Sequence, residues 1–219
     1  MSKTILSKRQ IKFLKLFSLD KNLSTNFYLT GGTALAEFYI PYRLSEDLDF
    51  FSENEFDLLP ITIFLKSIKK ELDYIKFDIN TSFNRNIIHL IFKDEILKLE
   101  FTYFPFSQIE KPKRKNGIKI DSVIDIATNK VFTIYQKPRT RDFMDLYMIN
   151  KNYQFKLNDL IKKAKIKFDW HIDPVKLGSQ LMLARKLKDY PNLITPMKDI
   201  GWQKYFEEYA KSLKKEIFK

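Results

Sequence analysis

Two aspartates one residue apart, Asp47 and Asp49, lie in the stretch DLDFF, whose other residues are those of a buried strand. Side chains alternate along a strand, so both carboxylates point to one face while Leu48 points into the core. Like charges held this close repel each other, and the arrangement is stable mainly beside a cation or at a wet surface. Because Mg²⁺ prefers oxygen ligands, the pair predicts a site for Mg²⁺ (or Mn²⁺).

Two of the chain's five glycines, Gly31 and Gly32, are adjacent and precede this pair. They follow the short aromatic run NFYLT and precede the helix-forming run TALAEFY, which Thr33 is placed to cap. Glycine allows close approach to the backbone, and free N–H groups at a helix N-terminus attract phosphate. We therefore expect Gly31, Gly32 and the Thr33 hydroxyl to bind phosphate. A triphosphate beside metal-binding aspartates indicates phosphoryl or nucleotidyl transfer.

A two-metal site needs a third carboxylate from a neighbouring strand. Glu100 is the best candidate, because it is the one acid in the apolar run ILKLEFTY and lies on the more polar face of that strand. Asp78 is the alternative candidate. A single acid on a strand is also commonly just exposed to solvent, and the sequence leaves that interpretation of Glu100 open.

The elements that position these residues follow from periodicity and from turn residues. Strands are expected over 26–30 and 47–51, with two or three antiparallel strands between 74 and 104, and a basic loop at 110–117. Helices are expected over 4–19, 33–39, 60–72, 122–136, 140–152, 156–168, 173–187 and 202–218. The pattern predicts an α/β (α+β) domain at 1–117, with a mixed sheet flanked by helices, and a helical C-terminal region at 118–219.

The composition limits the class of protein. There is no cysteine, and His89 and His171 are too few for a histidine metal cluster. The N-terminus lacks the apolar core of a signal peptide, and no apolar run is long enough to span a bilayer, so we expect a cytoplasmic protein without a membrane partner. The net charge of +12 favours polyanionic partners such as nucleotides and RNA.

The motifs GGTALAE, RLSEDLDFF and LKLEFTY, in this order, resemble the nucleotidyltransferase superfamily. More closely, the chain resembles the AbiEii/AbiGii toxins of abortive-infection and toxin–antitoxin systems. That branch has a Gly-Gly-Thr-Ala-Leu turn, an Arg-x-Ser-x-Asp-x-Asp segment, a downstream Lys and a helical Arg-Asp-x-x-Asp-Leu. These correspond here to residues 31–35, residues 43–49, Lys130 and residues 141–146.

The resemblance implies a nucleotidyltransferase-type sheet and a set of site residues. The implied catalytic residues are Asp47, Asp49, Glu100, Lys130 and Asp142, of which Asp47, Asp49 and Glu100 would bind metal. The implied nucleotide-binding residues are Gly31, Gly32, Thr33, Arg43, Ser45 and Lys130. Lys130 would reach the triphosphate as a point charge, and Asp142 would orient it, so that the helical region contributes both to the cleft.

The residues alone suggest a different interpretation of the downstream motif. Arg141 and Asp145, at i and i+4, would form a surface ion pair, and Lys130 would be one more solvated lysine. The resemblance favours functional roles for Lys130 and Asp142, and less firmly for Asp145.

The function that follows is metal-dependent transfer of a nucleoside monophosphate from an NTP to an acceptor. The resemblance implies RNA as acceptor, such as the tRNA 3′ end, and a toxin opposed by a cognate antitoxin. The basic runs KPKRK (111–115) and KPRTR (137–141) could form a rim for RNA, or be ordinary solvated loops. Alternatives are a catalytically silent nucleotide- or RNA-binding protein, a transferase that modifies a protein, and kinase-like phosphoryl transfer.

Overall fold

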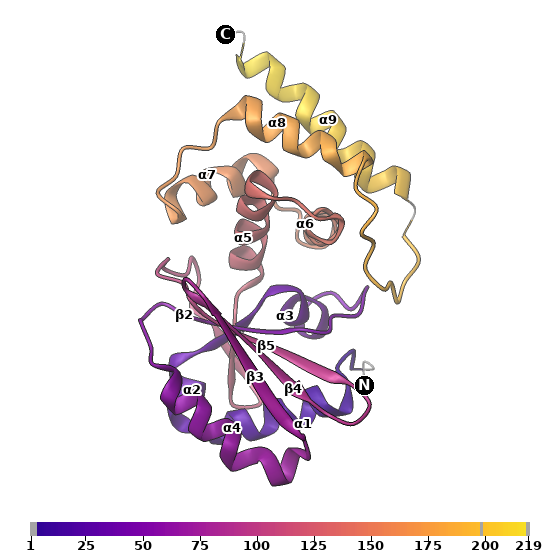
Figure 1. Cartoon of the computed structure of the whole chain (residues 1–219). Coiled ribbons are helices and arrows are strands. Elements are labelled where there is room, and N and C mark those ends of the chain that lie inside the picture. The colour runs from indigo at the N-terminus through magenta and orange to yellow at the C-terminus, as the bar shows by residue number, and fades with distance from the viewer. Residues whose placement is uncertain (1–3, 198, 218–219) are drawn as a thin grey trace. The chain divides into compact units, whose positions relative to one another are not determined.

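The computed structural model describes residues 4–197 and 199–217. The chain divides into two compact units, one that ends at Ser122 and one that begins at Val123. The first contains the β-sheet, and the second is helical in the part described (Figure 1). The mixed sheet and the helical C-terminal region expected from the sequence are thereby confirmed.

A seven-stranded mixed sheet lies at the centre of the first unit, in the order β3-β4-β5-β2-β1-β7-β6. Strand β2 pairs parallel with β5 and β1 pairs parallel with β7, whereas the other neighbours are antiparallel. The strands are β1 (Tyr28–Thr30), β2 (Leu48–Ser52), β3 (Lys76–Ser82), β4 (Arg85–Ile91), β5 (Ile96–Tyr103), β6 (Lys113–Lys115) and β7 (Ile118–Ile120).

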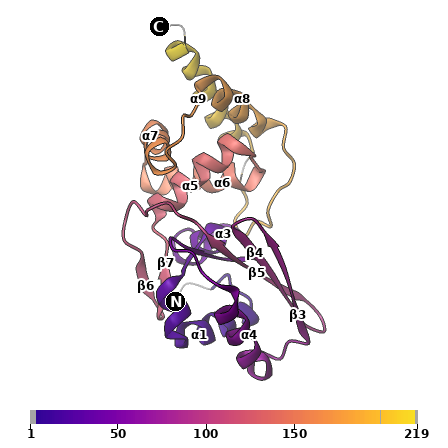
Figure 2. The same cartoon turned by 60° about the vertical axis from the view of Figure 1, so that its left-hand side comes forward.

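Helices cover both faces of this sheet (Figures 1 and 2). They are α1 (Lys8–Leu19), α2 (Lys21–Asn26), α3 (Gly31–Phe38) and α4 (Leu58–Leu72). On the face covered by α1 and α4, the rings of Phe17, Phe50 and Phe101 stack, with centroids 4.4 Å apart for Phe17 and Phe50 and 5.1 Å apart for Phe50 and Phe101. Because side chains alternate along β2, the burial of Leu48 and Phe50 on this face leaves Asp49 on the opposite face.

The second unit is built from amphipathic helices, namely α5 (Val123–Gln136), α6 (Thr140–Tyr153), α7 (Leu157–Lys167), α8 (Pro174–Met182) and α9 (Asp199–Ile217), with a 3₁₀ turn at Leu183–Arg185. Its core includes Phe143, Trp202 and Phe206, all fully buried. Residue 218, at the end of the helix expected over 202–218, lies outside the described residues.

Three features of the fold differ from the sequence-based expectations. The segment 110–117 is not only a loop, because it contains β6, which pairs with β7. Strand β7 in turn pairs with β1, so the sheet extends past residue 117 and the helical unit begins at Val123 instead of residue 118. The short helix α2 was not expected.

Within the described residues, no helix combines the length and the apolarity required to cross a membrane.

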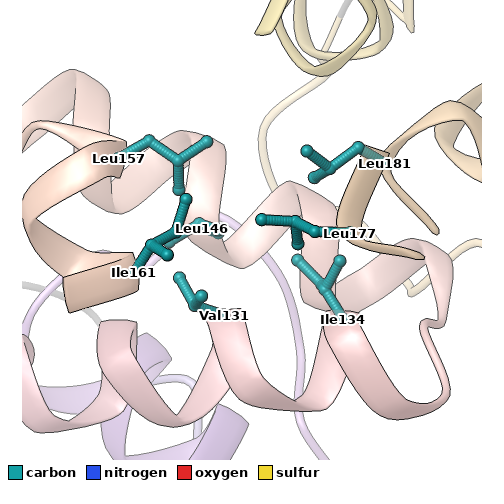
Figure 3. Close-up of a pocket in the computed structure, with 7 residues that line it drawn as sticks. All are labelled: Val131, Ile134, Leu146, Leu157, Ile161, Leu177 and Leu181. Atoms are coloured by element: carbon teal, nitrogen blue, oxygen red, sulfur yellow. The ribbon is translucent and has the colours of Figure 1, made fainter. Parts of the chain in front are cut away.

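An apolar cavity of about 10 Å³ lies inside the second unit (Figure 3). Its lining is entirely aliphatic and consists of Val131, Ile134, Leu146, Leu157, Ile161, Leu177 and Leu181. A space of this size holds at most about one water molecule, and the lining offers a water no polar partner. The cavity is therefore a packing gap where α5, α6, α7 and α8 meet.

We predict that Leu177→Ala lowers the free energy of unfolding by about 3–5 kcal/mol, because Leu177 is buried and its removal enlarges an existing gap. The matched control is Val175→Ala in the same helix, since Val175 is 55% exposed. The control should stay within about 0.5 kcal/mol of the wild type. Urea denaturation of the two variants measures the difference, and equal losses would show that Leu177 does not support the helical core.

Candidate active site

Asp49 and Glu100 are direct neighbours on parallel strands. Asp49 of β2 is in register with Glu100 of β5, so the two side chains lie on the same face of strands about 4.8 Å apart. Thr30 of β1 faces Asp49 from the other side. Asp78, the alternative third acid, lies on β3, which is separated from β5 by β4, and its side chain is 57% exposed. The sheet therefore places Glu100, and not Asp78, beside the aspartate pair.

Glu100 is buried and forms a bidentate ion pair with Arg85 of β4. Arg85 Nε donates to Glu100 Oε1 at 2.8 Å and Nη2 donates to Oε2 at 2.6 Å, while the Thr102 hydroxyl donates to Oε1 at 3.0 Å. The hydrogen bonds to Glu100 raise the pKa of Arg85, against desolvation, and the charges of Glu100 and Asp49 add to this effect. The interpretation of Glu100 as a solvent-facing acid is wrong, because only 8% of its side chain is exposed.

Asp47 precedes β2, and the segment 45–47 is held by three other elements. Its Oδ2 atom lies 2.7 Å from Lys98 Nζ of β5. Its backbone carbonyl accepts a hydrogen bond from the hydroxyl of Thr33 in α3. Gln10 of α1 donates to the carbonyls of Ser45 and Glu46 at 3.2 and 3.0 Å. The acidic segment is thus fixed in place before β2 begins.

Thr33 is not the helix cap that the sequence predicted. Helix α3 begins at Gly31 with Thr30 in the N-cap position, so Thr33 is inside the first turn and does not cap the helix. Its side chain is fully buried and its hydroxyl is used in the bond to Asp47. In this structure Thr33 therefore positions the acidic segment.

The two glycines make room for side chains of the acidic segment. A Cβ at Gly31 would overlap Asp49 Oδ2, and a Cβ at Gly32 would overlap Arg43 Nη2 and lie 3.1 Å from Ser45 Oγ. Gly31 also has a φ of +70°, which favours glycine. The structure thus brings Gly32, Arg43 and Ser45 together at the first turn of α3, and it places the Asp49 carboxylate at the N-terminal end of that helix, where a negative charge is favourable.

Replacement of Gly31 by alanine is predicted to destabilise the protein by about 1–3 kcal/mol, because alanine is strained at this φ and its Cβ displaces Asp49. Gly178 in α8 provides a control, since a Cβ there meets only Leu213 Cδ1 at 3.9 Å and the Ala210 carbonyl at 4.0 Å. Gly178→Ala should be neutral or stabilising by about 0.5–1 kcal/mol. Thermal denaturation distinguishes the two, and a Gly31→Ala protein as stable as Gly178→Ala would contradict the close packing of Asp49.

Asp121 is a buried acid that sequence reasoning missed. It follows β7 and accepts hydrogen bonds from the Thr30 hydroxyl at 2.6 Å, Gln108 Nε2 at 2.8 Å and the Ser122 amide at 3.1 Å. Its own carbonyl accepts from the Tyr39 hydroxyl. No spacing motif marks this residue, because its partners come from distant parts of the chain. Asp121 ties β1, the segment that follows β7 and the loop before β6 together.

In the second unit, Lys130 of α5 is held by two buried aspartates of α6. Its Nζ atom lies 2.7 Å from Asp142 Oδ1 and 2.8 Å from Asp145 Oδ2, and neither carboxylate is exposed. The expected surface pair of Arg141 and Asp145 is wrong, because Asp145 is buried and binds Lys130. Lys130 is not a solvated lysine either, since only 11% of its side chain is exposed. The two aspartates fix the position of its ammonium group.

The donor atoms of the first unit suit a divalent metal ion. Asp47, Asp49 and Glu100 offer only carboxylate oxygens, which are hard ligands of the kind that Mg²⁺ and Mn²⁺ prefer. Positive charge is already needed at this site, because the cationic groups of Lys98 and Arg85 neutralise two of the three acids. In the described part of the chain, no three His, Asp or Glu side chains are already arranged to hold a metal ion.

A comparison with protein families matches residues 15–216 to the family described as nucleotidyl transferase AbiEii toxin, type IV toxin–antitoxin system. The chain belongs to this family. The AbiEii match includes every candidate residue of both units. It confirms the resemblance identified in the sequence motifs, and nucleotidyl transfer is the activity for which the family is named.

Individual relatives of this AbiEii family member agree with the match. An uncharacterized protein, aq_aa25 of Aquifex aeolicus (strain VF5), is 33% identical over 168 residues, which cover 73% of this chain and 77% of the relative. Two crystal structures from Helicobacter pylori each superpose with a TM-score of 0.60. One is a candidate nucleotidyltransferase with 25% identity, covering 96% of this chain and 97% of the neighbour. The other is JHP933, with 26% identity and coverages of 96% and 94%.

Proposed function

We propose that the protein transfers a nucleoside monophosphate from an NTP to RNA, with the tRNA 3′ end as the acceptor, in a Mg²⁺-dependent reaction. The observation that carries this proposal is the register of Asp49 with Glu100 on parallel strands, beside Asp47 and at the first turn of α3, in a chain of the AbiEii family. Asp49 and Glu100 lie on one sheet face with Asp47 just before β2, and this group of acids is suited to bind a divalent cation.

Each residue has a proposed task in this reaction. Asp47, Asp49 and Glu100 would hold the metal, which supplies charge neutralisation of the triphosphate and acidifies the attacking hydroxyl. Gly32, Arg43 and Ser45, which meet at the first turn of α3, would contact phosphate oxygens, and Gly31 lets Asp49 approach them. Lys130, oriented by Asp142 and Asp145, would neutralise charge that develops on the leaving pyrophosphate.

The charge distribution supports RNA as the acceptor. Residues 123–219 contain 20 Lys and Arg against 11 Asp and Glu, a formal charge of +9, whereas residues 1–122 carry +3. Three of the acids in the helical unit, Asp125, Asp142 and Asp145, are fully buried and paired with lysines. The solvent-facing charge of that unit is therefore strongly positive, as expected of a surface that binds a polyanion.

An aromatic side chain in the same unit is suited to stack on an unpaired base. Trp170 is 53% exposed and packs edge-on against Phe132, with ring centroids 6.3 Å apart. Phe132 in turn stacks on Phe168 at 4.0 Å, which holds the indole in place. An exposed aromatic side chain in a basic unit is a common means of binding single-stranded RNA such as a tRNA 3′ end.

As a member of a type IV toxin–antitoxin family, the protein is proposed to act as a toxin that a cognate antitoxin opposes. The test of the chemistry is incubation with Mg²⁺, total tRNA and each NTP labelled at either the α- or the γ-phosphate. Transfer of α-label to RNA supports the proposal. Transfer of γ-label would indicate a kinase, labelling of a protein would replace the acceptor class, and RNA binding without NTP consumption would indicate a silent binding protein.

A further inference from the structure

Glu100 and Asp47, both proposed metal ligands, are paired with basic side chains of the same sheet. Arg85 binds both oxygens of Glu100, and Lys98 binds Asp47 Oδ2. Lys98 and Glu100 are two residues apart on β5 and point to the same face. The negative charge of Asp49, which lies in register with Glu100, also raises the pKa of Arg85. Two internal cations therefore neutralise most of this acidic face.

The Arg85–Glu100 pair is asymmetric in burial. Only 8% of the Glu100 side chain is exposed, whereas 56% of the Arg85 side chain is. A carboxylate this deeply buried is costly without a cation, so Glu100 keeps a positive partner in any stable state. More than half of the Arg85 side chain is already in contact with solvent, so Arg85 is the partner that can turn away when another cation takes its place at Glu100. In the second pair, Lys98 and Asp47 are 32% and 28% exposed, so both side chains already contact solvent and Lys98 can leave Asp47.

A metal ion and Arg85 would compete for the same carboxylate oxygens of Glu100. Arg85 uses both oxygens of Glu100 in a bidentate pair, which is among the stronger hydrogen-bonded ion pairs in proteins. A divalent ion at Glu100 would repel a guanidinium held within a few ångströms. Occupation by metal and occupation by Arg85 are therefore alternatives at Glu100, and the same reasoning applies to Lys98 at Asp47.

We propose that Arg85 and Lys98 are built-in counter-cations that a divalent ion has to displace, so that they set the metal affinity of the acidic face. This inference rests on the proposed function, because it takes Asp47, Asp49 and Glu100 as the metal ligands. It assigns the two basic residues a positioning role: they stabilise the metal-free fold and weaken metal binding. The negative charge of Glu100 and Asp47 is fully available to the ion only when Arg85 and Lys98 have moved away from these carboxylates.

The experiment measures Mn²⁺ binding in the absence of NTP and RNA, by electron paramagnetic resonance of the free ion. Arg85→Gln and Lys98→Gln should each bind Mn²⁺ about tenfold more tightly than the wild type, because a competing cation is gone. Arg85→Lys keeps a cation and should stay closer to the wild type than Arg85→Gln. The matched control is Arg9→Gln, since Arg9 also pairs with two carboxylates, Asp94 and Glu95, in the same unit but outside the acidic face.

A second readout separates this role from a purely structural one. Without metal, Arg85→Gln should melt at a lower temperature than the wild type, and saturating Mn²⁺ should raise its melting temperature more than that of the wild type. A structural arginine would lower both melting temperatures equally.

The outcomes distinguish this inference from the function on which it rests. If Asp49→Asn weakens Mn²⁺ binding while Arg85→Gln and Lys98→Gln leave it unchanged or weaken it, the counter-cation role is overturned and the metal site stands. If Asp49→Asn leaves Mn²⁺ binding unchanged, the ion binds elsewhere and both proposals fail. Tighter binding by the two Gln variants, with Arg9→Gln unchanged, supports the inference.

Discussion

Asp49→Asn is expected to reduce nucleotidyl transfer by a factor of about 10³ or more while the protein remains folded. Asp49 is the acid that lies in register with Glu100 and against Gly31, so it is central to the proposed metal site. Asparagine keeps the shape of the side chain but removes the charge that binds the ion. The loss of repulsion with Glu100 and the loss of favourable interactions with Arg85 and the N-terminal end of α3 oppose each other, so thermal stability should change little.

Asp78→Asn is the matched control for this variant. Asp78 is also an aspartate on a strand of the same sheet, but it lies on the edge strand β3 and pairs with Lys76 in solvent. Transfer by Asp78→Asn should equal that of the wild type. Initial rates with labelled NTP measure the activity. Equal rates for Asp49→Asn and Asp78→Asn would show that Asp49 takes no part in the reaction.

Lys130→Met is expected to abolish transfer and to destabilise the helical unit by about 3–5 kcal/mol. Its ammonium group neutralises Asp142 and Asp145, which are both fully buried, so removal of the cation leaves two carboxylates without their lysine in the core. Arg139 Nε, 3.2 Å from Asp142 Oδ2, is a second cation beside Asp142. The free energy of unfolding, measured by urea denaturation, reports this effect.

Two further variants separate stability from function at Lys130. Lys167→Met breaks the buried pair of Lys167 with Asp125 and should be destabilising in the same way, yet the protein that remains folded should retain transfer. The triple variant Lys130→Met/Asp142→Asn/Asp145→Asn removes the uncompensated charges and should recover much of the stability without activity. Recovery of activity together with stability would show that Lys130 has only a structural role.

Much of the first unit could be predicted from local signals. The alternation of DLDFF identified the strand and the face of Asp49, but β2 begins at Leu48, so Asp47 precedes the strand instead of lying in it. Turn glycines and helix formers likewise located α3. The three-residue strands β6 and β7 were missed because they are too short to show a periodicity. Strand β7 is held by pairing with β1, in which Tyr28 is in register with Lys119, 91 residues later in the chain.

The site could be predicted only in part. The sequence shows which residues could bind a metal or phosphate, but it does not show which residues of neighbouring strands are paired. Nothing in the sequence fixes which residue of β5 faces Asp49, and the parallel pairing that selects Glu100 depends on the whole sheet. For the same reason the partners Arg85 and Lys98 were not foreseen. The mistaken surface pair of Arg141 and Asp145 arose from helical spacing alone, which does not reveal that α6 turns Asp145 toward Lys130 of α5.

The central claim is that the acidic face transfers a nucleoside monophosphate to RNA. Its most direct test is to incubate wild-type protein and Asp49→Asn with Mg²⁺, total tRNA and each α-³²P-labelled NTP, and to resolve the RNA by electrophoresis. We predict that label from at least one NTP appears in tRNA with the wild type and that the label is absent with Asp49→Asn. Labelled tRNA in equal amount with both proteins, or label that enters RNA only from the γ-phosphate, would contradict the proposed site and reaction.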